Sequence, residues 1–144
     1  MNREKSCGAV VFTRRNGKPE FLVLREVGGG YSLPKGHVEG CETEIETARC
    51  EIFEETGLWP AFLEGFRREE EYDLAEKPGT RKTVVYFLAE YGNGPVTTRP
   101  GEITDARLLP CGQAATLLRH EGTRRILREA YEFLTGEHNE EESI

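Results

Sequence analysis

The sequence predicts a mixed α/β (α+β) fold, and three observations support it. Runs of β-branched and aromatic residues occur in both halves of the chain and predict strands. Two segments space their apolar residues as helices do. The 144 residues fit one domain of ordinary size. We expect residues 1–136 to form this domain and the acidic residues 137–144 to be a disordered tail.

The first two strands are predicted to form a hairpin. The apolar segment Ser6–Thr13 and the segment Glu20–Arg25 flank the turn-forming residues Arg14–Pro19. The segment Tyr31–Gly40 follows a run of glycines and contains a proline and two further glycines. We expect it to be a loop with specific backbone demands.

A helix with clear start and stop signals is predicted next. Thr43 can cap the N-terminus, with Glu46 three residues later in the capping-box arrangement. Gly57 can end the helix in a left-handed conformation, and Pro60 prevents its continuation. The apolar positions between these signals fall on one face: Ile45, Ala48 and Ile52.

The second half of the chain is predicted to return to strands and end in helix. The expected elements are one long strand over Ala61–Tyr72, a turn over Ala75–Arg81, a strand over Lys82–Tyr91, a strand over Ile103–Leu109, and a helical region over Gly112–Thr135 with a break at His120–Thr123.

Composition and charge exclude several classes of protein. Lys and Arg number 19 against 26 Asp and Glu, a net charge of −7 that disfavours binding to long nucleic acids and anionic membranes. No apolar run approaches the ~20 residues that span a bilayer. The four cysteines show no CxxC spacing, and they are too sparse for a disulfide scaffold. We expect a cytoplasmic protein.

Three glutamates on the first predicted helix form a candidate metal site. At helical spacing Glu54 lies about 60° to one side of Glu51, and Glu55 about 40° to the other. Glu55 falls at the edge of the apolar stripe, so these acids border the core. Like charges at this spacing repel, whereas a divalent cation would bring them into coordination. Oxygen ligands suit Mg²⁺, with Mn²⁺ as a substitute. The alternative is an ordinary solvated acidic face.

The residues around these glutamates carry a resemblance to a known family. The segment Gly36–Leu58 resembles the Nudix box, GX5EX7REUXEEXGU with U apolar. Three flanking segments, Pro34–Glu39, Glu64–Glu69 and Lys82–Glu90, resemble the asymmetrical diadenosine tetraphosphate hydrolase branch of that family.

The resemblance implies an α/β/α sandwich with a mixed sheet between helices, and hydrolysis of a nucleoside diphosphate linked to a further group. By analogy, Glu51, Glu54 and Glu55 would ligate Mg²⁺, and Glu102 would complete the metal site or act as base. We therefore expect Glu54, Glu55 and Glu102 to be catalytic, with water attacking phosphorus.

The resemblance also implies which residues contact substrate. Lys35, His37 and Lys82 match polyphosphate-contacting positions, Gly36 opens the box beside them, and Tyr86 matches a residue that stacks on adenine. Surface lysines, a loop histidine and a core tyrosine are the alternatives.

Two departures from the pattern bear on function. Cys50 stands where the box has arginine, so Glu42, the expected partner of that arginine, is left to contact a different cation. Ala106 and Leu108 occupy places where the branch has aromatic residues. Either Tyr72 or Phe66 could then supply the second aromatic surface.

The leading hypothesis is an enzyme that cleaves dinucleoside polyphosphates, diadenosine tetraphosphate to ATP and AMP. The alternatives are hydrolysis of a nucleoside triphosphate, a nucleotide sugar or a 5′-triphosphorylated RNA, and a nucleotide-sensing module without turnover. The expected partner is a small-molecule nucleotide, without membrane or long nucleic acid, and the expected state is a monomer or weak dimer.

Overall fold

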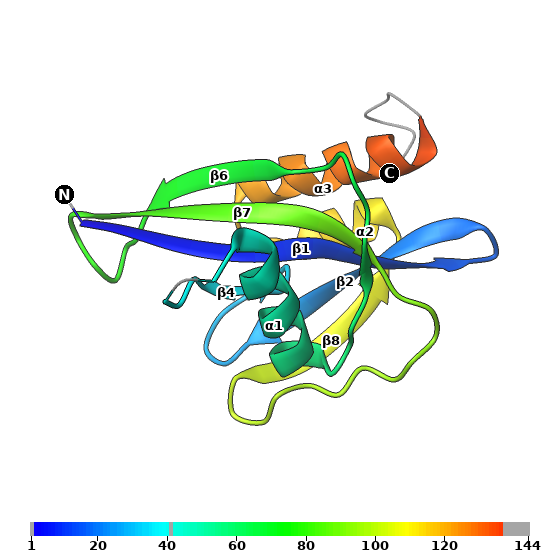
Figure 1. The fold of residues 1–144 in the computed structure, drawn as a ribbon, viewed down its shortest axis with the longest axis horizontal. Helices are drawn as coiled ribbons and strands as arrows, with labels where there is room; N and C mark the ends of the chain where they lie inside the picture. Colours follow the sequence, from blue (N-terminus) through cyan, green and yellow to red (C-terminus); the bar gives the residue numbers. More distant parts are fainter. Residues whose placement is uncertain (1, 41, 137–144) are drawn as a thin grey trace.

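The fold is a mixed sheet between helices, as the resemblance implies (Figure 1). The computed structural model describes residues 2–40 and 42–136. The predicted tail, residues 137–144, lies outside the described residues. In this part of the chain eight strands form one sheet, in which β3, β2, β1, β7 and β5 are successive neighbours. The elements are β1 (Asn2–Arg15), β2 (Lys18–Glu26), β3 (Tyr31–Ser32), β4 (Lys35–His37), α1 (Glu44–Thr56), β5 (Ala61–Phe62), β6 (Arg68–Asp73), β7 (Thr80–Glu90), β8 (Ile103–Leu109), α2 (Cys111–Leu117) and α3 (Glu121–Thr135).

The centre of the sheet is the parallel pair β1 and β7, which is aligned from Asn2 opposite Thr80 to Phe12 opposite Glu90. Alternate residues of β1 enter two separate hydrophobic clusters. One cluster packs against α2 and α3, and the other packs against α1. Strands buried on both faces in this way carry the nearly continuous apolar sequences that predicted them.

The predicted hairpin and helices are confirmed. Strands β1 and β2 pair antiparallel around a tight turn. Helix α1 has the full capping box between Thr43 and Glu46, and Gly57 ends it at φ 74°. The C-terminal helical region is broken into α2 and α3 as expected, but the break lies at residues 118–120 and not at His120–Thr123, since residues 121–123 form the first turn of α3. None of the described helices is long and apolar enough to cross a membrane.

The expected single strand over Ala61–Tyr72 is wrong. It consists of β5 and β6, separated by a turn in which Gly65 has φ 95°. Phe62 pairs with Ala89 on β7, and Arg68 pairs with Tyr86 on the same strand. Residues 63–67 of the chain therefore span only the short distance from Ala89 to Tyr86, and they form the turn between the two strands. A left-handed glycine permits that turn, and residue types alone did not reveal it.

The expected loop over Tyr31–Gly40 contains two short strands instead. The second, β4, pairs antiparallel with β1, placing Lys35 opposite Gly8. This approach is so close that a Cβ on Gly8 would lie 1.9 Å from the carbonyl oxygen of Pro34. The missing side chain at Gly8 therefore lets β4 lie against the centre of the sheet.

We expect Gly8→Ala to destabilise the protein by about 3 kcal/mol or more, because the added methyl group meets rigid backbone. Gly92→Ala is the matched control, since nothing lies within 4 Å of the added Cβ. It should change the free energy of unfolding by less than about 0.5 kcal/mol. Denaturant unfolding measures both, and equal stability of the two variants would contradict the close packing of β4.

Candidate functional site

Two of the three box glutamates, Glu51 and Glu55, lie on the side of α1 that contacts β4. Glu55 is buried, with 7% of its surface exposed, Glu51 is partly buried, and Glu54 is exposed. Glu55 and Glu51 therefore border the core, as the helical spacing predicted, whereas Glu54 lies in solvent.

Strand β4 packs directly on these acids. A Cβ on Gly36 would lie 2.0 Å from Oε1 of Glu51, so only glycine fits there. The backbone N–H of Lys35 donates to the carboxylate of Glu55. The glycine at the start of the box and the glutamates on its helix thus form one packed unit.

Burial makes two of these carboxylates resist ionisation. Desolvation, and then the charge of Glu54, raise the pKa of Glu51 to about 7. Desolvation is also the main cause that raises the pKa of Glu55 to about 8, although the charge of Lys35 opposes it. A cation bound to these groups would favour their ionised forms.

Arg99 links Glu54, the exposed box glutamate, to Glu102 on the distal loop. Its Nη1 lies 3.1 Å from Oε1 of Glu54, and its Nε lies 3.5 Å from Oε2 of Glu102. Glu102 and Glu55 line the same surface hollow, together with Glu26. We call Glu51, Glu54, Glu55 and Glu102 the acidic site.

The donor set of the acidic site fits a hard divalent cation. Its side chains offer only oxygen ligands, and two of them are desolvated carboxylates whose ionisation a cation would favour. Within residues 2–40 and 42–136, however, no three Asp, Glu, His or Cys side chains converge into a preformed metal site. The guanidinium of Arg99 gives a reason, since it holds Glu54 and Glu102 in ion pairs.

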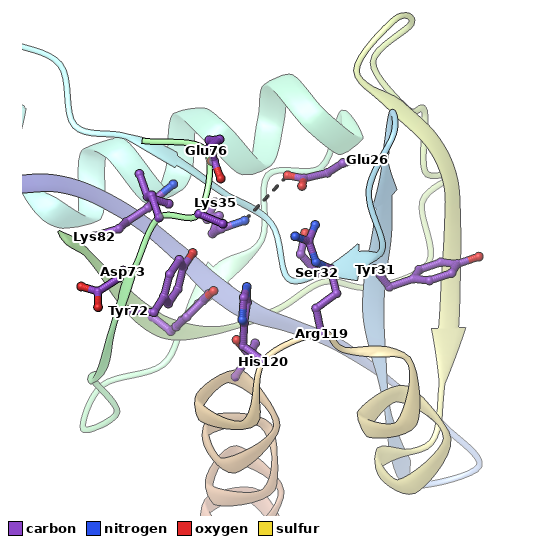
Figure 2. Close-up of a pocket in the computed structure, with 14 residues that line it drawn as sticks. Glu26, Tyr31, Ser32, Lys35, Tyr72, Asp73, Glu76, Lys82, Arg119 and His120 are labelled. Atoms are coloured by element: carbon purple, nitrogen blue, oxygen red, sulfur yellow. Dashed lines mark ion pairs between the residues drawn. The ribbon is translucent and has the colours of Figure 1, made fainter. Parts of the chain in front are cut away.

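A pocket of about 230 Å³ lies on the other side of Lys35 (Figure 2). Lys35 and Lys82 both line it, and Nζ of Lys35 lies 3.7 Å from Oε2 of Glu26. Burial, followed by the charge of Lys35, lowers the pKa of Lys82. Two amines in a partly desolvated pocket are suited to phosphate. We call this the lysine pocket.

The wall of the lysine pocket is aromatic. The rings of Tyr72 and His120 stack with centroids 4.5 Å apart and planes at 16° (Figure 2). Arg119 packs against the glycine run after β2, where a Cβ on Gly30 would lie 2.7 Å from its Cδ. A planar ring beside cationic groups is suited to a heterocyclic base joined to phosphate.

The structure divides the predicted site residues between these two places. Lys35, Lys82 and Tyr86 line the lysine pocket, whereas Gly36, Glu51, Glu54, Glu55 and Glu102 form or contact the acidic site. His37 joins neither group: its exposed ring lies 3.1 Å from Oε1 of Glu4. Tyr86 is only 1% exposed, so its ring offers little surface for stacking.

Glu42, the expected partner of the missing box arginine, has another hydrogen-bond partner. Cys50 is exposed, and Glu42 accepts a hydrogen bond of 2.7 Å from the hydroxyl of Thr47. The described hydrogen bonds of Glu42 come from a backbone N–H and a hydroxyl, so the expected contact with a different cation is not found among them. A local hydroxyl binds the carboxylate that the box arginine would otherwise contact.

Of the two aromatic candidates, Tyr72 lines the pocket, and Phe66 is buried in the core against Phe133. Sequence reasoning missed His120, Arg119 and Arg99. The glycine run was a signal for Arg119, because consecutive glycines allow a side chain to pack closely on the backbone. Nothing local identified His120.

Comparison with known proteins finds a matching family, curated relatives and a solved structure of similar fold. The family profile described as NUDIX domain matches residues 3–130. Curated relatives include the bis(5′-nucleosyl)-tetraphosphatase [asymmetrical] of Rattus norvegicus, 37% identical over 142 residues, which cover 90% of this chain and 95% of the relative. The protein of the same name from Sus scrofa is 36% identical with the same coverage. A solved binary complex of C. elegans Ap4A hydrolase superposes with a TM-score of 0.85 at 27% identity, covering 92% of this chain and 98% of that one.

The raised carboxyl pKa values predict a pH dependence of stability. The folded protein holds protons on Glu51 and Glu55 up to about pH 7 and about pH 8, whereas the unfolded chain releases them near 4.5. The stability of metal-free protein should therefore fall as pH rises from about 4.5 to about 8. Glu55→Gln cannot ionise, so it should flatten this slope and raise the melting temperature at pH 8.

Denaturant unfolding in EDTA across this pH range measures the slope. The exposed Glu64→Gln is the matched control and should keep the wild-type slope. A Glu55→Gln variant with an unchanged slope would show that the carboxylate is solvated.

Proposed function

The chain belongs to the Nudix family, and on that basis we propose that it is a Mg²⁺-dependent pyrophosphohydrolase of dinucleoside polyphosphates, cleaving diadenosine tetraphosphate to ATP and AMP. The observation that carries the proposal is the placement of Lys35–Gly36, whose backbone packs on the acidic site while Lys35 lines the lysine pocket. The names and coverage of the curated relatives support the substrate.

The lysine pocket binds one nucleotide portion of the substrate. The base stacks on the Tyr72–His120 pair, and Lys35 and Lys82 bind the phosphates through charge-assisted hydrogen bonds. The polyphosphate then continues across β4 towards the acidic site. The two lysines also offset the overall negative charge of the protein where the substrate is most anionic.

The acidic site carries the chemistry. Glu51, Glu54 and Glu55 would hold Mg²⁺, which when bound supplies charge neutralisation on the phosphates and orients the attacking water. Glu102 would serve as the base for that water, because its carboxylate lines the same hollow as Glu55 on α1. Arg99 keeps Glu54 and Glu102 close to each other until substrate and metal bind.

One observation favours the alternative of a sensing module without turnover. The ion pairs of Arg99 with Glu54 and Glu102 could be kept permanently in a protein that binds nucleotide without metal. The alternative substrates, a nucleoside triphosphate, a nucleotide sugar or a 5′-triphosphorylated RNA, use the same acidic site. A cytoplasmic location and a monomeric or weakly dimeric state remain predictions.

We expect incubation with Mg²⁺, diadenosine tetraphosphate and ¹⁸O-labelled water to give ATP and AMP as sole products, with one of them labelled. Glu54→Gln should reduce turnover at least about 100-fold. Its melting temperature should stay nearly equal, since the repulsion of Glu51 that is relieved is offset by the loss of the exposed ion pair with Arg99. Mass spectrometry and calorimetry measure these outcomes.

Glu64→Gln serves as the control for Glu54→Gln and should keep full activity. Full activity of Glu54→Gln would disprove its metal role, and inertness of the wild type towards every nucleotide class named above would favour the sensor.

We expect Lys82→Met to raise KM about 10- to 100-fold with kcat nearly unchanged, because a charge-assisted phosphate contact contributes about 1.5–3 kcal/mol. Lys18→Met, at the exposed start of β2 after the hairpin turn, is the matched control and should leave both constants unchanged. Steady-state kinetics measure the split. A fall in kcat alone would instead place Lys82 at the reacting phosphorus.

A further inference from the structure

A buried carboxylate behind the aromatic wall is unexplained by the proposed chemistry. Glu70 lies on β6 with 7% of its surface exposed, outside both the acidic site and the lining of the lysine pocket. Burying a carboxylate costs stability unless it is hydrogen-bonded. Glu70 meets this requirement through contacts with α3.

Glu70 is bonded to the start of α3. The hydroxyl of Thr123 donates to its Oε2 at 2.5 Å. The phenol of Tyr86 hydrogen-bonds to both Glu70 and Thr123. A Cβ on Gly122 would lie 2.6 Å from Oε1 of Glu70, so the carboxylate is in direct contact with the first turn of the helix.

This contact adds a carboxylate to the N-terminal end of α3, whose own first-turn acid, Glu121, is ion-paired with Arg124 and Arg128. The N-cap residue of α3, His120, makes no side-chain capping hydrogen bond. The first turn of a helix carries unpaired N–H groups and a partial positive charge, which a carboxylate stabilises. Glu70 provides this carboxylate from a strand 53 residues away in sequence from Thr123.

The same strand and the same helix end also carry the aromatic wall. Glu70 and Tyr72 are two residues apart on β6 and so point to the same face of the sheet, the one covered by α3. His120 immediately precedes α3 and stacks on Tyr72. Any shift of the helix start relative to β6 would move one ring of the pair past the other.

We propose that Glu70 is a positioning residue, which fixes the start of α3 on β6 and thereby sets the stacked Tyr72–His120 surface that receives the base. Its effect on substrate rests on the proposed function, whereas its effect on the ring pair does not. An apolar residue could fill the same space, but it would supply neither the acceptor for Thr123 nor the charge at the helix end.

The test combines a spectroscopic measurement with kinetics. Stacking on Tyr72 should shift the His120 ring protons upfield in the NMR spectrum, and His120→Asn assigns them. Glu70→Leu should lose most of this upfield shift and raise KM about 10-fold, with kcat within about twofold of the wild type. Glu70→Gln keeps an acceptor for Thr123 and should retain most of the shift and a KM near that of the wild type.

Glu71→Gln is the control, because Glu71 lies on the exposed face of the same strand. It should change neither measurement. Should Glu70→Leu fail to fold, Thr123→Val removes one hydrogen bond and should reduce the upfield shift in the same direction.

The outcomes separate the two proposals. An unchanged His120 shift in Glu70→Leu, or in Thr123→Val if the former does not fold, would overturn the positioning role. A lost shift in a protein whose wild type turns over no nucleotide would support the positioning role and overturn the proposed function. A lost shift with unchanged KM would refute the link between the ring pair and the base.

Discussion

The close approach of β4 to both β1 and α1 is the constraint on which the candidate site depends. Two glycines permit it, Gly8 beneath Pro34 and Gly36 beside Glu51. The approach buries the Glu55 carboxylate against the backbone of Lys35, and at the same time it brings the Lys35 side chain to the lysine pocket. One short strand therefore joins the lysine pocket, which we propose binds phosphate, to the acidic site, where we propose that water attacks.

Local signals predicted the parts of the fold that depend on neighbouring residues. The capping box of α1 and its terminal glycine lie within a few residues of the helix, so the sequence alone defined both ends. The strand expected over Ala61–Tyr72 was wrong because residue types do not reveal where β7 is paired. The left-handed Gly65 and the two separate pairing points are properties of the assembled sheet.

The candidate site shows the same division. The spacing of Glu51, Glu54 and Glu55 indicated an acidic face that borders the core, and Lys35 and Lys82 followed from flanking segments. His120 could not be predicted, because its contact with Tyr72 exists only once α3 packs on β6. Glu70 is likewise one of several glutamates in an acidic run, and only the direction of its side chain distinguishes it from Glu69 and Glu71.

The ion pairs of Arg99 have a consequence for how the acidic site fills. Two of its carboxylates already have an internal counter-ion, so a divalent ion, if these residues bind one as proposed, would enter by exchange and not by addition to bare charges. Exchange would lower the net free energy gained on binding, because the ion pairs of Arg99 with Glu54 and Glu102 would be lost and the rehydration of its guanidinium would only partly offset that loss. Occupancy should then follow the ambient concentration of the ion closely, as expected of a reversible and readily emptied site.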